Sequence, residues 1–115
     1  MHDAKSVTKY VRVPPRKARL VADVIRGLFV EEAKAQLTHA HNKSGRLLKK
    51  TLDTALANAH MLGDVREDQL VVLEVRVDEG PRLKRAKARS KGSRVPVVKR
   101  TSHFTIVVGE QEGVL

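Results

Sequence analysis

The sequence predicts an α+β fold, in which three helices pack on a small antiparallel sheet and a long basic β-hairpin protrudes. Apolar residues recur at helical spacing in three segments between residues 15 and 62. They alternate with polar residues around 6–13, 70–78 and 97–108, as expected for strands. Positive charge is concentrated between residues 81 and 100, in the interval between the last two of these strands.

The length and composition indicate one domain. The chain has 115 residues, of which 41% are hydrophobic, and this is enough apolar material for one core but seldom for two. We expect a single domain over 1–115, with a globular part at about 5–79 and 99–110 and an extended hairpin at about 80–98.

The first strand and helix are separated by two prolines. Val7, Lys9, Val11 and Val13 alternate with other residues until Pro14 and Pro15 end the strand. Proline is tolerated in the first helical turn, so a helix can run from Pro15 to Arg26 and stop at Gly27. The stripe expected to be buried consists of Ala18, Leu20, Val21, Val24 and Ile25.

Two further helices are expected before residue 63. One runs from Val30 to about His41, with Glu31 and Glu32 near its positive end, although Phe29 offers no capping acceptor. The other is capped by Asn42 or Ser44 and reaches about Leu62. Its apolar residues at helical spacing are Leu48, Leu52, Ala55, Leu56 and Ala59. The alanines Ala55, Ala57 and Ala59 mark this as the central packing helix.

The last two strands predict the hairpin. Val71, Leu73, Val75 and Val77 share one face of the first, and Val98, Arg100, Ser102, Phe104, Ile106 and Val108 share one face of the second. Antiparallel neighbours in sequence usually pair. If Asp78 pairs roughly with Thr101, each arm beyond has about ten residues and the tip stands about 30 Å from the domain.

The charge distribution indicates a polyanionic partner. The formal net charge is +10, and residues 81–100 contain nine basic side chains and no acid. Like charges at this density repel one another unless water or opposite charge surrounds them. A purely solvated loop is the less favoured interpretation, because ordinary loops usually contain acids as well and none occurs between Glu79 and Glu110. The nine are Arg82, Lys84, Arg85, Lys87, Arg89, Lys91, Arg94, Lys99 and Arg100.

The start of the first helix supports the same conclusion. Arg16, Lys17 and Arg19 oppose the positive end of the helix dipole, whereas a phosphate there would satisfy both the cations and the free N–H groups. The aromatic residues Tyr10, Phe29 and Phe104 all lie outside the basic segment, which disfavours base stacking by that segment.

We expect no catalytic site, cofactor or metal. The chain has no cysteine, and His39 and His41 point about 200° apart on a helix, which does not suit a shared zinc ion. Ser102 and His103 alternate across a strand, and no phosphate-binding glycine loop is present. No apolar run approaches the roughly 18 residues of a membrane span, and the start lacks a signal-peptide core, so a cytoplasmic protein is expected.

Several motifs resemble the family of bacterial ribosomal protein twenty-two of the large subunit. They are, in order, VRVPPRKARLVADVIRG, VEEAKAQL, TALANA and VDEGPRLKRAKARSKGSRVPVVKRTSHFTIVVGE. The most specific are Val77 to Pro81, Leu83 to Arg85, Arg89 to Gly92 and Lys99 to His103. The resemblance implies three helices against a three-stranded antiparallel sheet plus an extended hairpin.

The resemblance also implies a function and partners. The body would bind large-subunit ribosomal RNA beside neighbouring ribosomal proteins and support subunit assembly. The hairpin would line the peptide exit tunnel, with its tip near the nascent peptide. No homo-oligomer and no membrane contact are expected. The tunnel tip would comprise Ala88, Arg89, Ser90, Lys91, Gly92, Ser93 and Arg94. The rRNA-binding residues would be Lys9, Arg12, Arg16, Lys17, Arg19, Arg82, Lys84, Arg85, Lys87, Arg89, Lys91, Arg94, Lys99 and Arg100.

Two other functions compete with this interpretation. An architectural DNA-binding protein could lay a basic β-arm in a minor groove and insert a proline such as Pro96, but such arms usually work in symmetric pairs. A membrane-active hairpin would need a strong apolar face, for which Leu83 and Val95 are too few.

Overall fold

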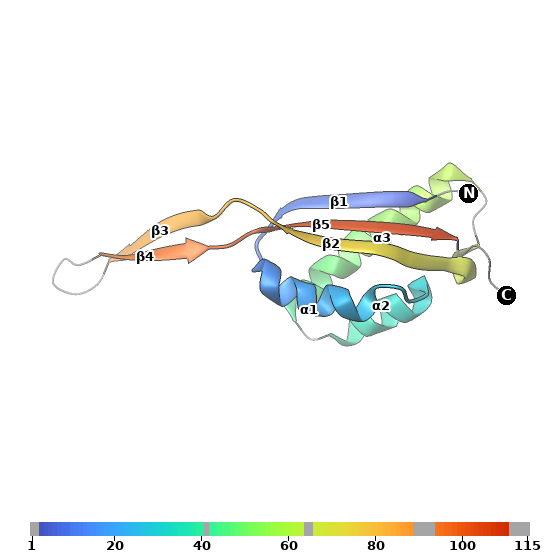
Figure 1. Ribbon diagram of the computed structural model, residues 1–115, viewed down its shortest axis with the longest axis horizontal. Coiled ribbons are helices and arrows are strands. Elements are labelled where there is room, and N and C mark those ends of the chain that lie inside the picture. The colour runs from blue at the N-terminus through green and yellow to red at the C-terminus, as the bar shows by residue number, and fades with distance from the viewer. Residues whose placement is uncertain (1–2, 41, 64–65, 89–93, 111–115) are drawn as a thin grey trace.

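The computed structural model describes residues 3–40, 42–63, 66–88 and 94–110. Within them the elements follow the predicted order, and Figure 1 shows the hairpin leaving one end of a body of helices and strands. The elements are β1 (Ala4–Val11), α1 (Pro15–Ile25), α2 (Val30–His39), α3 (Lys43–Leu62), the 3₁₀ turn η1 (Glu67–Gln69), β2 (Leu70–Glu79), β3 (Leu83–Ala88), β4 (Arg94–Lys99) and β5 (Ser102–Glu110).

The body contains a three-stranded antiparallel sheet in the order β1-β5-β2. Ala4 pairs with Val108 on one side of β5, and Val77 pairs with Phe104 on the other. The α+β class with three helices on a three-stranded sheet is therefore confirmed.

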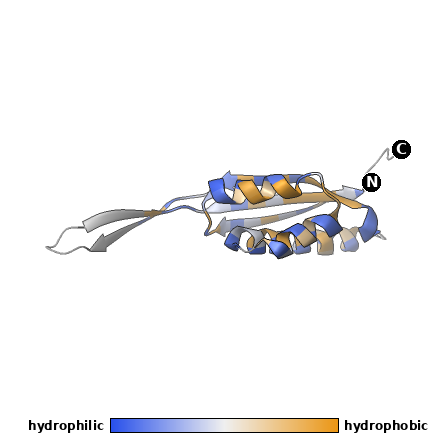
Figure 2. Cartoon of the chain, turned by 90° about the horizontal axis from the view of Figure 1, so that it is seen from below, coloured by the Kyte–Doolittle hydropathy of each residue, from blue (hydrophilic) through white to orange (hydrophobic). Residues whose placement is uncertain are grey.

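The helices cover one face of this sheet and close the core. Contacts place α1 over β2 and α3 over β1 and β5, while α2 packs against α1 and α3. Figure 2 shows strongly hydrophobic residues on the helices and strands of the body. The largest fully buried side chains come from every layer: Phe104, Ile25, Leu37, Leu48, Leu52, Leu70 and Ile106.

The buried stripe of α1 differs from the prediction. Ala18, Ala22 and Ile25 are fully buried, whereas Leu20 and Val24 are 69% and 54% exposed. The two alanines let the helix lie close to its neighbours, and residues two positions along are turned to the outer side. The prediction was wrong for Leu20 and Val24 and missed Ala22.

The ends of α2 and α3 follow their capping residues. Asn42 caps α3, and its Oδ1 accepts a hydrogen bond of 2.7 Å from the Gly45 N–H. Phe29 provides no side-chain cap for α2, as expected, and α2 ends at His39, two residues earlier than predicted. The predicted apolar stripe of α3 is buried throughout, but Ala57 is exposed and plays no part in close packing.

Bulges change the buried face of β1 and of β2. The register of β2 shifts between Val72 and Glu74, so that Val72 and Val75 are buried while Leu73 is 44% exposed. The register of β1 shifts between Thr8 and Val11, and Val7 is exposed whereas Val11 is buried. The prediction for Leu73 assumed perfect alternation, and the residue inserted at the bulge breaks that alternation and turns Leu73 to the exposed face.

The hairpin is a separate two-stranded sheet. Leu83 pairs with Lys99, and the pairing continues to Ala88 and Arg94. The expected continuous strand from 97 to 108 is interrupted at Arg100 and Thr101. Asp78 pairs with His103 instead of Thr101, a shift of two residues that leaves every side chain on the same face.

The base of the hairpin is held by two short hydrogen bonds. The Gly80 N–H donates to the Thr101 carbonyl at 2.9 Å, and the Thr101 hydroxyl donates to the Pro81 carbonyl at 2.6 Å. Pro81 has no N–H with which to continue the ladder, which explains the break in the sheet. The molecule measures 67 × 24 × 19 Å, and the hairpin accounts for the elongation visible in Figure 1.

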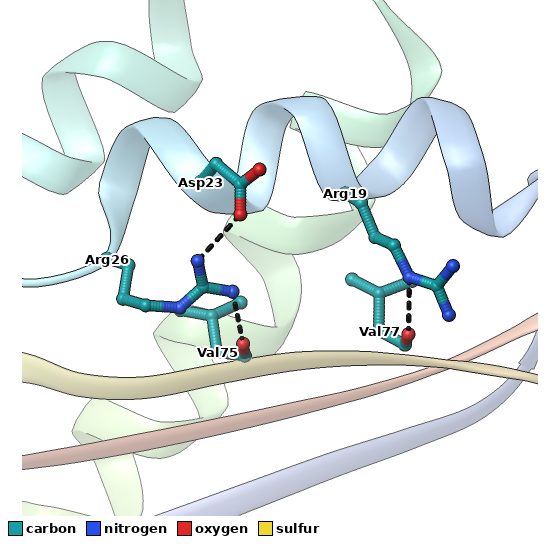
Figure 3. A network of polar contacts seen from close by, with 5 residues as sticks. All are labelled: Arg19, Asp23, Arg26, Val75 and Val77. Atoms are coloured by element: carbon teal, nitrogen blue, oxygen red, sulfur yellow. Dashed lines mark hydrogen bonds and ion pairs between the residues drawn. The ribbon is translucent and has the colours of Figure 1, made fainter.

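The free edge of β2 is closed by α1 and the loop that follows it. The Arg19 Nε–H donates to the Val77 carbonyl at 3.1 Å, and an Arg26 terminal N–H donates to the Val75 carbonyl at 2.7 Å (Figure 3). Farther along the edge, Val72 exchanges hydrogen bonds with Gly27 and Leu28. The edge is thus covered and presents few backbone groups for a foreign strand to pair with.

Candidate nucleic-acid interface

A groove of about 730 Å³ lies where the hairpin joins the body. It is lined by residues from the end of β1, the start of α1, the start of α3 and both hairpin arms. Six of the nine lining residues are cations and none is an acid. The six are Arg12, Arg16, Lys17, Lys43, Lys99 and Arg100, and the others are Pro14, Leu83 and Val98.

Local chemistry places these cations along the walls of the groove. Pro15 begins α1 as the first helical residue, so Arg16 and Lys17 fall in its first turn. That turn has no side-chain cap and no acidic residue. On the opposite side, the pairing of Leu83 with Lys99 brings the last residue of β4 to the base of the hairpin.

The groove is suited to a phosphate backbone. All six cations are solvent-exposed, so they can reach an anion without leaving a buried environment. Cations on two sides of an open groove would contact successive phosphates and fix the position of an RNA strand. Pro14, Leu83 and Val98 form the remaining surface, and their side chains offer no sequence-reading groups.

The structure brings together only some of the predicted rRNA-binding residues. Arg12, Arg16, Lys17, Lys99 and Arg100 line one groove. Lys9 is exposed on the β1 bulge and Lys84 is exposed on β3, both outside that lining.

Arg82 and Arg19 are among the predicted residues that have partners within the chain. Arg82 forms an ion pair of 3.0 Å with Glu79, which offsets part of its charge. Arg19 donates to the Val77 carbonyl and helps to fasten α1 to β2. Its two terminal nitrogens take no part in that bond (Figure 3).

The predicted hairpin residues are placed only in part. Arg85, Lys87, Ala88 and Arg94 lie in the paired strands β3 and β4. The tip residues Arg89, Ser90, Lys91, Gly92 and Ser93 lie outside the described residues.

Lys43 is a groove residue that the sequence reasoning missed. It is the first residue of α3, and it faces the groove because Asn42 caps the helix immediately before it. A cation directly after a predicted cap is a usable signal, since helix starts recur at anion sites. Lys43 and Lys99 are more than fifty residues apart in sequence, so the sequence alone gave no sign that they line the same groove.

Tyr10 and His103 meet at the point where the hairpin leaves the sheet. In the β1 bulge two residues, Lys9 and Tyr10, face His103 alone. Tyr10 has a left-handed backbone with φ of 59°, and it is the only residue other than glycine with positive φ in the described part of the chain. Its N–H donates to His103 Nδ1 at 3.0 Å, and the two rings meet edge-on with centroids 5.0 Å apart.

His103 also packs against the first residue of the hairpin connection. A β-carbon added to Gly80 would lie 2.5 Å from the Thr101 hydroxyl oxygen and 3.1 Å from His103 Cε1. This close approach is why glycine stands at position 80. Tyr10, His103 and Gly80 therefore join β1, β5 and the hairpin at one point.

Over the described residues, no group of three or more His, Asp or Glu side chains could hold a metal ion, while His41 lies outside them. In the same part of the chain no helix has both the length and the apolar character needed to cross a membrane.

Comparison with known proteins points to a ribosomal protein family, in agreement with the cationic groove. The sequence matches the family described as Ribosomal protein L22p/L17e over residues 6–109. It is 58% identical to the large ribosomal subunit protein uL22 of Protochlamydia amoebophila over 108 residues, covering 94% of this chain and 97% of the relative. The uL22 proteins of Chlamydia abortus and Chlamydia trachomatis serovar L2 are 54% and 51% identical, with 94% and 93% of this chain covered and 97% and 96% of those relatives.

These matches extend through the helices, the sheet and the hairpin alike. They give no support to an architectural DNA-binding protein, which was the main alternative. The chain belongs to the ribosomal protein L22p/L17e family.

Proposed function

We propose that this chain binds large-subunit rRNA through the groove at the hairpin base and along the hairpin, as a non-catalytic structural protein. As a member of its family it is a constituent of the large ribosomal subunit, with rRNA and other ribosomal proteins as partners, and it is cytoplasmic as part of the ribosome. The observation that carries the specific proposal is the groove with six cations and no acid.

The hairpin extends this role beyond the body. The whole chain acts as one domain, from which the segment 80–98 reaches into RNA and lines the peptide exit tunnel. Residues 81–100 contain nine basic side chains and no acid, which would let this segment lie in a channel lined by phosphates. Its tip would meet the nascent peptide, and docking of the body would support subunit assembly without a second copy of the chain.

A pair of lysine variants tests the groove. Lys17→Ala with Lys99→Ala removes one cation from α1 and one from β4, both exposed and both lining the groove. The control, Lys5→Ala with Lys50→Ala, removes the same charge from exposed positions outside the groove lining.

The measurement is the affinity for deproteinised large-subunit rRNA over a range of salt concentrations. Two lost phosphate contacts should reduce the log–log salt slope by about 1.4 to 1.8, with the thermal unfolding midpoint unchanged. Equal losses in the control would mean that net charge alone drives binding, and the groove would no longer be the interface.

A further inference from the structure

We infer that Tyr10 is a stacking site for an unpaired RNA base at the base of the hairpin. The inference rests on the proposed rRNA binding and adds a contact of a different kind. The observation behind it is an exposed aromatic ring held at the hairpin base by a strained backbone and by His103.

Packing does not explain the presence of a tyrosine at position 10. The residue is 64% exposed, so its ring contributes little to the core. The bulge places it in the left-handed region, where glycine or asparagine would be free of steric strain. A bulky side chain in a strained conformation with little burial indicates a role outside folding, because such outliers concentrate at functional sites.

His103 holds Tyr10 in this position. Nδ1 of His103 accepts the hydrogen bond from the Tyr10 N–H, and its ring packs edge-on against the tyrosine ring. His103 in turn lies against Gly80, at the start of the hairpin connection. The aromatic ring is therefore preorganised on three elements and need not be ordered when a ligand binds.

The surroundings of Tyr10 favour a nucleobase as the ligand. Lys9 precedes it and is exposed, while Arg12, two residues on, lines the cationic groove. RNA bound by its phosphates at Lys9 and at this end of the body would bring unpaired bases within reach of the exposed ring. Aromatic side chains accept any base by stacking, so this contact requires no particular nucleotide.

The chain offers a clean reporter, because Tyr10 is the only tyrosine and there is no tryptophan. Nitration of the full-length chain by tetranitromethane, followed by mass analysis, reports the accessibility of this one ring. Deproteinised large-subunit rRNA should slow nitration at least severalfold compared with the free chain. Equal rates with and without RNA, under conditions in which RNA is bound, would overturn the inference.

Two substitutions separate the ring from the backbone. Tyr10→Asn keeps a residue that tolerates the left-handed conformation but removes the ring, and it should weaken rRNA binding by about 5-fold to 150-fold. Tyr10→Phe keeps the ring and should bind within about twofold of the original chain. Met61→Asn, at an exposed position near the far end of α3, is the matched control and should leave affinity unchanged.

The outcomes distinguish this inference from the proposed function. If Tyr10→Asn binds as tightly as the original chain while Lys17→Ala with Lys99→Ala weakens binding, stacking is overturned and the groove stands. If the unmodified chain itself fails to bind rRNA, both proposals fall. If Tyr10→Phe weakens binding as much as Tyr10→Asn, the hydroxyl group and not the ring makes the contact, which also overturns stacking.

Discussion

Glu67 joins three elements through its two carboxylate oxygens. One oxygen accepts a hydrogen bond of 2.7 Å from Lys34 Nζ on α2, and the other lies 3.8 Å from His60 Nε2 on α3. The hydrogen bond from Lys34, helped by the positive charges of Lys34 and His60, holds the pKa of Glu67 below its ordinary value. A lowered carboxyl pKa means that the folded state favours the charged form.

The stability contributed by Glu67 should therefore depend on pH. It is fully present above the ordinary glutamate pKa of about 4.3 and is lost as the pH falls through the lowered folded-state value. We expect Glu67→Gln to reduce the free energy of unfolding at pH 7 by less than about 1 kcal/mol, since the ion pair is partly exposed.

Urea unfolding at pH 7 and near pH 3 tests this expectation. The difference between Glu67→Gln and the original chain should shrink toward zero at the lower pH. Asp53→Asn, at an exposed position on α3, is the control. A difference for Glu67→Gln that is the same at both pH values would show that the ion pairs of Glu67 do not stabilise the fold.

At the scale of elements, α1 and its C-cap residue protect the edge of β2 with two arginines. Arg19 and Arg26 lie seven residues apart, two helical turns, and their hydrogen bonds fall on Val77 and Val75, two residues apart on the strand. Asp23 accepts a hydrogen bond of 2.6 Å from Arg26 and steadies it (Figure 3). The helix and its C-cap thus stabilise the fold through Arg19 and Arg26, while the first turn of the helix lines the groove.

Replacing these two arginines should weaken the fold and expose the edge. Arg19→Met with Arg26→Met keeps most of the apolar stem but removes the donors, and we expect a loss of about 1 to 3 kcal/mol in unfolding free energy. Sedimentation should also detect more self-association, because backbone carbonyls on the edge become available. Arg16→Met, in the same helix but lining the groove, should leave both quantities unchanged; if it does not, loss of charge and not edge protection is responsible.

At the scale of the whole molecule, the body and the hairpin are two separate sheets. Among the side chains that the structure describes, the buried core lies in the three helices, in β1, β5 and β2, and at Val13 just after β1. The short contacts of Gly80 with Thr101 and of Thr101 with Pro81 close the body at its edge. Folding of the body should therefore not depend on the hairpin.

Shortening the hairpin tests this separation. Replacing residues 83–98 by a short glycine-serine turn should leave the thermal unfolding midpoint within a few degrees of the original. It should also lower rRNA affinity and its salt dependence, because most of the basic segment is removed. The measurements are thermal unfolding followed by circular dichroism and rRNA binding at several salt concentrations. A body that fails to fold without the hairpin would contradict the division into a globular part and an extended hairpin.

The elements themselves could be predicted because their signals are local. Leu48, Leu52 and Leu56 define the buried side of α3 by spacing alone, Asn42 marks its start, and Pro15 and Gly27 bracket α1. The buried faces were predicted less well. Leu20 was assigned to the core on apolar character, although the close approach of Ala18 and Ala22 to the sheet turns it outward. Leu73 failed because a bulge leaves no trace in an alternating pattern.

The sequence by itself determined the α+β class, the order of helices and strands, the basic hairpin and the family, because each depends on short-range patterns or on motifs read along the chain. Only the tertiary structure decided that Lys43 joins Lys17 and Lys99 in one groove, that Arg19 is bonded to β2, and that Tyr10 stands against His103. The physical reason is that these contacts join residues tens of positions apart, whose meeting depends on strand register and helix packing, and neither is encoded by a local period.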